Sequence, residues 1–327
     1  MKQTLKFCAW SMSWLLLGSV LWAAPTIAHS PNVPSSPWHS SQGDRLSPDQ
    51  VLHDLAQSTV IYLGETHDNP ADHQAQLQII QALQQRHSQL AIAMEMFQRP
   101  YQESLTQYLA GHISETELLQ QTQYEQRWGF PWQYYAPIVQ FAKAQQLPII
   151  ALNTPSEVTR QVAQTGLDSL SPEALQWIPP LSEIDLNHAA YRQRIQEVFN
   201  SIHQGHSFSG NFDYFFQAQV LWDETMADSI ASFLNTHPGY HVVVLAGQGH
   251  IIYGDGIPSR VARRLQNRRG FQQRSLLLNP DELTLNELSP DALSPDKAIP
   301  RREPVADYFW LSSTAKEGIT DSSTGDR

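Results

Sequence analysis

The chain has 327 residues, a formal charge of −11 and a single cysteine, Cys8. The acidic balance argues against nucleic acid as a partner, because binding to the phosphate backbone depends on clustered Lys and Arg. One cysteine excludes an internal disulfide. Its place near the N-terminus also leaves the rest of the chain without thiolate ligands or a cysteine nucleophile.

Residues 1–28 have the features of a secretory signal peptide. Lys2 and Lys6 precede a mostly apolar run, and small residues at 25–28 suit cleavage. The run is shorter than the ~20 residues that span a membrane, and the neighbours of Cys8 do not form a lipoprotein cleavage box. We therefore expect export to the periplasm or to the extracytoplasmic side of a membrane, with an uncleaved anchor as the alternative.

Beyond this segment, apolar and polar stretches alternate in the pattern of an α/β protein. Residues 29–46 are rich in Pro, Ser and His and are expected to form a flexible linker. Ser47 and Pro48 then match the N-cap and first turn of a helix. Five apolar runs predict strands: 59–63, 90–94, 148–152, 241–246 and 274–278. Helical patterns separate these runs, which favours a mostly parallel sheet flanked by helices.

A long stretch without a strand pattern separates the third and fourth predicted strands. A parallel crossover needs only about a dozen residues, so the surplus predicts an inserted, smaller, all-helical subdomain over residues 154–235. The α/β domain then comprises residues 47–153 and 236–315. Residues 316–327 are polar and are expected to form a disordered tail.

The first predicted strand runs into the sequence GETHDNP, which carries Glu65 and His67. Asn69 and Pro70 match the start of a helix, so both side chains are expected in a strand-to-helix turn. A carboxylate beside an imidazole can orient the ring, raise its basicity or share a metal with it. The structural alternative is that His67 only packs in the turn.

Polar residues also follow the second and fourth predicted strands. Glu95 lies in LAIAMEMF, where a buried carboxylate costs several kcal/mol unless it is paired. Pairing with Arg99 is the structural alternative for Glu95. His250 follows a Gly-Gln-Gly turn, in which glycine allows close approach to a ligand. Tyr253 comes three residues later, and its phenol is a candidate ligand for ferric iron.

The carboxyl ends of parallel strands meet at one edge of a sheet, where ligands bind. We therefore expect His67, Glu95 and His250 to converge, with Glu65 supporting His67. Two His and one or two Glu can hold Zn²⁺ or Mn²⁺ with an open position for water. Without a metal, the same residues can activate water as the general base of a hydrolase. A third possibility is an interaction protein whose site has no ligand.

The ordered set of motifs resembles the ChaN-like haem-binding uptake family of the Tiki/TraB/erythromycin-esterase superfamily. It consists of GETH, MEMF, WDETMA at 222–227, GQGH, GIPSR and ADYFWL at 306–311. The similarity runs from about Val60 to Leu311. It implies an α/β domain with a smaller helical domain, export, and haem handling in iron acquisition. Other branches of the superfamily are hydrolases.

The resemblance also places a shared site at His67, Glu95 and His250. Haem is then the expected ligand, with an axial ligand from Tyr253, His250 or His67 and with Glu65 and Glu95 beside it. A homodimer and an outer-membrane haem uptake system are the expected partners.

Overall fold

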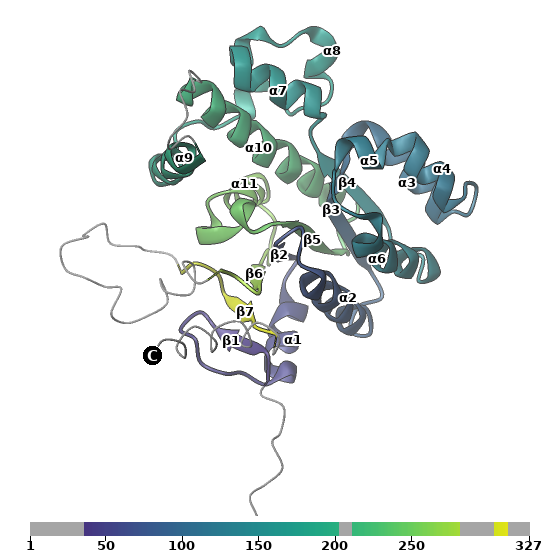
Figure 1. Cartoon of the computed structure of the whole chain (residues 1–327). Helices are drawn as coiled ribbons and strands as arrows, with labels where there is room; N and C mark the ends of the chain where they lie inside the picture. The colour runs from purple at the N-terminus through teal and green to yellow at the C-terminus, as the bar shows by residue number, and fades with distance from the viewer. Residues whose placement is uncertain (1–35, 203–210, 282–303, 313–327) are drawn as a thin grey trace, which may run out of the picture. The chain divides into compact units, whose positions relative to one another are not determined.

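The computed structural model of the chain describes residues 36–202, 211–281 and 304–312 (Figure 1). The expected signal peptide, the first part of the expected linker and the expected tail lie outside the described residues. Within these three ranges, no helix combines the length and the apolar character needed to cross a membrane.

A seven-stranded sheet organises the described chain, in the order β1-β7-β6-β2-β5-β3-β4. Every pairing from β7 to β4 is parallel, and only β1 runs antiparallel to its neighbour. The expected α/β fold with a mostly parallel sheet is therefore confirmed. The strands are β1 (Trp38–Ser40), β2 (Val60–Glu65), β3 (Leu90–Gln98), β4 (Ile149–Asn153), β5 (His241–Gly247), β6 (Gln273–Leu278) and β7 (Tyr308–Trp310).

Helices cover both faces of the sheet, because successive strand residues point to opposite sides. Ile61 and Leu63 of β2 join one apolar cluster with α1, α2 and α6, and Val60 and Tyr62 join a second with α10 and α11. The helices are α1 (Pro48–Gln57), α2 (Pro70–Gln84), α3 (Gln102–Leu109), α4 (Glu115–Thr122), α5 (Tyr124–Arg127), α6 (Trp132–Ala144), α7 (Ser156–Thr165), α8 (Pro172–Leu175), α9 (Ala189–Ile202), α10 (Phe212–Thr236) and α11 (Ile257–Arg264).

Two helices begin where the sequence predicts. The Ser47 side chain accepts a hydrogen bond from the backbone N–H of Gln50 and caps α1. The Asn69 side chain accepts one from Ala71 and caps α2, with Pro70 in the first turn. The Asn69 cap fixes the start of α2 and therefore the short turn between β2 and α2 that carries the GETH motif.

The described residues between β4 and β5 contain helices and no strand, in agreement with an all-helical insertion. Val158 and Val162 of α7 pack with Leu221 of α10 in a small apolar cluster of their own. Figure 1 shows α10 running between α7 and α11, and α10 also contacts β4. The long helix α10 therefore ties the insertion to the sheet.

The expected linker is wrong over its described part, residues 36–46, because these residues carry β1. Trp38 is only 3% exposed, and its ring meets the ring of Trp310 edge-on at 4.6 Å. The pairing partner β7 was not predicted from the sequence either. Strands of three residues are too short for an alternating pattern, and these two are held by pairing and by the tryptophan contact.

Two histidines stack near the start of β5, away from the GETH turn. The rings of His87 and His241 lie 3.8 Å apart, and burial together with the charge of His241 lowers the pKa of His87. A histidine with a lowered folded-state pKa stays neutral while the unfolded chain takes up a proton. Stability is therefore lost as the pH falls through the ordinary value of 6.5.

We predict that His87→Phe, which keeps an aromatic ring, reduces the loss of melting temperature between pH ~7.5 and ~5.5. Thermal unfolding at the two pH values measures the difference. His112→Phe is the matched control, because His112 is exposed. An equal pH response in both variants would show that the stacked pair does not destabilise the fold in acid.

Candidate functional site

The turn after β2 holds a carboxylate–imidazole pair. Nδ1 of His67 lies 2.8 Å from Oε1 of Glu65, the last residue of β2. The turn is fixed from the helix side, because Asp72 in the first turn of α2 accepts the backbone N–H of Thr66 at 2.8 Å. Because Nδ1 faces the Glu65 carboxylate, a neutral His67 ring carries its proton on Nδ1, and Nε2 faces the rest of the site.

Glu65 is itself only 2% exposed and is held by two hydrogen bonds. The Tyr135 hydroxyl donates to Oε1 and the Gln76 amide donates to Oε2, each at 2.6 Å. Burial alone lowers the pKa of His67, but the hydrogen bond to Glu65 and the charges of Glu95 and Glu65 raise it more. The net shift is upward, so this pair favours the protonated ring.

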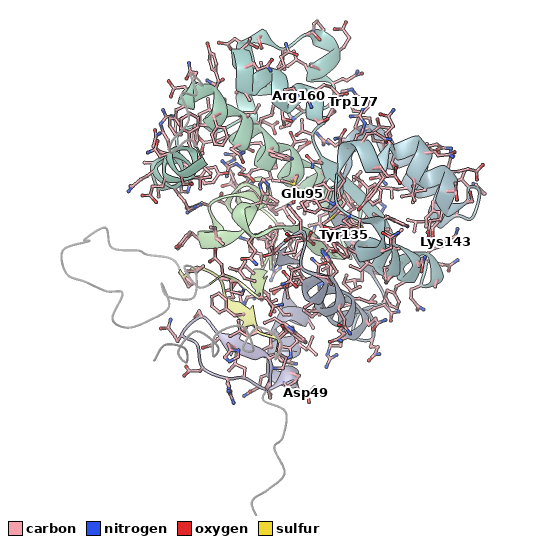
Figure 2. The ribbon with its side chains drawn as sticks, viewed as in Figure 1. Asp49, Glu95, Tyr135, Lys143, Arg160 and Trp177 are labelled. Carbon is pink, nitrogen blue, oxygen red and sulfur yellow. The ribbon has the colours of Figure 1, made fainter. Side chains whose placement is uncertain are left out.

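A second pair forms between β3 and the turn after β5. Oε2 of Glu95 accepts the backbone N–H of Gly247 at 2.8 Å, and Oε1 lies 3.6 Å from Nε2 of His250. Figure 2 shows Glu95 near the centre of the described chain, whereas Asp49 and Lys143 lie at its rim. The expected alternative, pairing of Glu95 with Arg99, is wrong, because Arg99 pairs with Asp228.

His250 lies in the 3-10 turn η4 (Gln248–His250). Its Nδ1 lies 2.7 Å from Oδ1 of Asp223, so each ring nitrogen faces a carboxylate. Burial alone lowers the pKa of His250, but the charges of Glu95 and Asp223 and the hydrogen bond to Asp223 raise it to about 9. Both ring nitrogens are therefore donors, and neither offers a lone pair to a metal.

Further buried groups hold Asp223 in place. The Tyr191 hydroxyl donates to its Oδ2, and the guanidinium of Arg260 lies 4.0 Å from the same atom. The next residue, Glu224, accepts hydrogen bonds from Arg263 and Arg264. Since these residues come from α9, α10 and α11, the network joins the helical insertion to the carboxyl edge of the sheet.

Gly247 brings the two pairs together. A Cβ added at this glycine would stand 3.0 Å from both Cε1 and Nε2 of His67, and 3.8 Å from Oε2 of Glu95. His67 thus lies directly against the end of β5, next to Glu95. The structure places His67, Glu95 and His250 at one edge of the sheet, with Glu65 behind His67.

This arrangement is a set of charge pairs rather than an open metal site. Among the described residues, no group of three His, Cys, Asp or Glu has the geometry to hold a metal ion. The proposed Zn²⁺ or Mn²⁺ site at His67, Glu95 and His250 is therefore not supported. The physical reason is that His250 is committed to two carboxylates, which the sequence alone does not show.

Tyr253 occupies a strained position in η5 (Ile252–Gly254), just beyond this network. Its backbone is left-handed, with φ 58° and ψ 5°, a conformation that costs about 1–3 kcal/mol for a residue other than glycine. Its backbone N–H donates to the carbonyl of Val305 at 2.9 Å. The guanidinium carbon of Arg194 stands 4.8 Å from the centre of the phenol ring. A cation in this place stabilises negative charge on the ring and its oxygen.

Aromatic rings flank the histidines. Trp128 and Phe130, which precede α6, stand 4.8 and 5.0 Å from the ring of His67. Trp222 of α10 stands 5.2 Å from the ring of His250. A separate cavity of about 660 Å³ lies along the outer edge of β4, between α3 and α10, and none of these residues lines it. The cavity holds no cluster of titratable side chains, so the carboxyl edge is the better candidate for chemistry.

Several residues of the network were not found from the sequence. Tyr135 and Gln76 support Glu65, and Asp223 and Tyr191 support His250. The sequence offers one signal for these residues, the adjacent acids Asp223 and Glu224 in WDETMA. Two neighbouring carboxylates in a mostly apolar stretch of α10 need cationic or hydrogen-bonding partners when they are buried.

We predict that Gly247→Ala destabilises the protein by about 1–3 kcal/mol, because the new methyl group would stand 3.0 Å from the ring of His67, which is held by Glu65 and must give way by a few tenths of an ångström. Urea unfolding measures the change. Gly249→Ala is the control, since a Cβ there meets nothing within 4 Å. Equal unfolding midpoints for the two variants would mean that His67 is not packed against β5.

We predict that the His250 ring titrates with a pKa of about 9, and that Asp223→Asn lowers this value. Because the folded-state pKa is raised, the stabilisation is complete below the ordinary value of 6.5 and is lost as the pH rises through about 9. The difference is roughly 3 kcal/mol. NMR of the imidazole nitrogens gives the pKa directly. A ring that titrates at or below 6.5 would contradict the charge pairing.

Comparison with known proteins agrees with this architecture. A family model described as "Haem-binding uptake, Tiki superfamily, ChaN" matches residues 51–261. A solved structure described as "Cofacial heme binding to ChaN of Campylobacter jejuni" superimposes with a TM-score of 0.62 and 18% sequence identity. The match covers 84% of this chain and 95% of that one. At this identity, the likeness shows a shared fold.

A curated plant relative matches at the level of sequence. The Arabidopsis thaliana protein RETICULATA-RELATED 5, chloroplastic, is 27% identical over 277 residues, which cover 81% of this chain. The match covers only 35% of the relative, so this chain spans about a third of that protein's length.

Proposed function

The chain belongs to the haem-binding uptake family of the Tiki superfamily that includes ChaN, and we propose that it binds haem outside the cytoplasm as part of iron acquisition. Support for haem as the ligand comes from the family match over residues 51–261. Support for export comes from the signal-like residues 1–28. A homodimer and an outer-membrane uptake system remain proposed partners.

We infer that Tyr253 supplies the iron ligand. Haem needs an axial donor, apolar contacts and polar groups for its propionates. Tyr253 is partly exposed, and a guanidinium lies against its ring. A phenolate is an established type of haem ligand, so the strained placement of this tyrosine beside a cation is the observation that carries the proposal. Bound haem would supply a ferric iron, and the chain would supply the ligand and its orientation.

The two histidines are less suited to this role. His250 offers no lone pair, because both ring nitrogens face carboxylates. His67 packs Cε1 and Nε2 of its ring against the backbone at Gly247, and its Nδ1 is bound to Glu65. The metal-dependent hydrolase that the sequence left open is not favoured for the same reason, since it requires an unpaired His250.

The buried network then acts as the support of the tyrosine. His250 anchors the start of the loop through Glu95 and Asp223. Ile251 is fully buried, and Gly256 approaches the carbonyl of His250 so closely that only glycine fits. The loop between these points is therefore fixed at both ends, which keeps Tyr253 in its left-handed conformation.

We predict that purified wild-type protein sharpens the Soret band of hemin at micromolar concentration, and that Tyr253→Phe removes this change by deleting the ligand oxygen. Absorbance titration measures both. Tyr240→Phe is the matched control, because Tyr240 is also a partly buried tyrosine beside the second apolar cluster. Wild-type protein that leaves the spectrum of hemin unchanged would refute haem binding, and a Tyr253→Phe variant that binds like wild type would refute the ligand.

A further inference from the structure

Arg194 is placed beside the proposed iron ligand by a helix of the insertion. It lies on α9, and its guanidinium carbon stands 4.8 Å from the ring centre of Tyr253 and 5.3 Å from that of Tyr191. Its Nη1 forms an ion pair with Asp255, which follows Tyr253 by two residues. Arg194 is therefore tied to the same loop as the tyrosine.

The hydrogen bonds of Arg194 are incomplete. Nη1 donates to Asp255, whereas Nη2 is buried and meets no acceptor among the described residues. The Asp255 carboxylate is shared between two groups: Oδ2 pairs with Arg194, and Oδ1 lies 3.4 Å from Nε2 of His188. A buried guanidinium N–H without an acceptor is costly, so its retention points to an acceptor that the described part of the chain does not supply.

The Arg194 side chain as a whole is 17% exposed, so a ligand can contact the guanidinium from solvent, although a turn of the guanidinium is needed to present the buried Nη2 to it. A guanidinium presents several donors in a planar fork, which matches the two oxygens of a carboxylate. Arg192, two residues earlier, differs in this respect. It pairs with Asp213 and lies over Phe212 and Phe216, away from Tyr253.

We propose that Arg194 is a specificity-determining residue that binds a carboxylate of the ligand, namely a haem propionate, beside Tyr253. This inference rests on the haem-binding function proposed above. The insertion then contributes directly to ligand recognition, because α9 brings Arg194 to a loop that belongs to the sheet. The site would distinguish a porphyrin with free carboxylates from one whose carboxylates are esterified.

Titration of the full-length protein with hemin and with hemin dimethyl ester tests this role. The ester keeps the iron and the ring and lacks the carboxylates. We expect Arg194→Gln to weaken hemin binding by about tenfold or more, equivalent to ~1.4 kcal/mol, and to leave binding of the ester within about twofold of wild type. Arg192→Gln is the matched control on the same helix and should affect neither ligand.

The outcomes separate this inference from the function on which it rests. An equal loss for hemin and ester in Arg194→Gln would show that Arg194 acts on the tyrosine or the iron, which overturns carboxylate recognition. Unchanged hemin affinity in that variant overturns it as well. Wild-type protein that binds neither porphyrin would overturn haem binding itself. Circular dichroism of each variant confirms that the fold is intact before the titrations are compared.

Discussion

The ion pairs that His250 makes with Glu95 and Asp223 are the interaction on which the carboxyl edge of the sheet depends. Two carboxylates buried this deeply are costly unless a cation lies between them. The imidazolium meets that need and joins β3, the turn after β5 and α10 at one point. Arg260 and Tyr191 extend the same network into α11 and α9. The helical insertion is thus attached to the sheet by charge as well as by apolar packing.

This constraint divides the polar residues into two groups. The inner group is satisfied within the protein: Glu65 holds His67, and Glu95 with Asp223 holds His250. The outer group faces the proposed ligand, and its members are Tyr253 and Arg194. We propose that the inner group fixes the loop and that the outer group binds haem. The histidines, which are common metal ligands, therefore serve in this proposal to hold the loop that carries Tyr253.

Long or local sequence patterns predicted the structure correctly. Long apolar runs showed the central strands, and the Asn69–Pro70 pair showed where α2 begins. Contacts with a partner distant in the sequence were not predicted. The polar residue His73 of α2 is buried and stacks on Tyr134. The charge of His250 depends on Asp223 from the insertion, and β1 depends on β7 from the other end of the chain. Such pairings arise from tertiary contacts that no local pattern encodes.

We propose that a tyrosine, held in place by the buried charge pairs, ligates haem iron. Resonance Raman spectroscopy of the hemin-loaded wild-type protein tests it most directly, because vibrations of an iron-bound phenolate are distinct from those of an imidazole ligand. We predict phenolate modes and a high-spin ferric iron. A low-spin spectrum with imidazole ligation would contradict it and return the histidines of the GETH and GQGH motifs to the role of ligands.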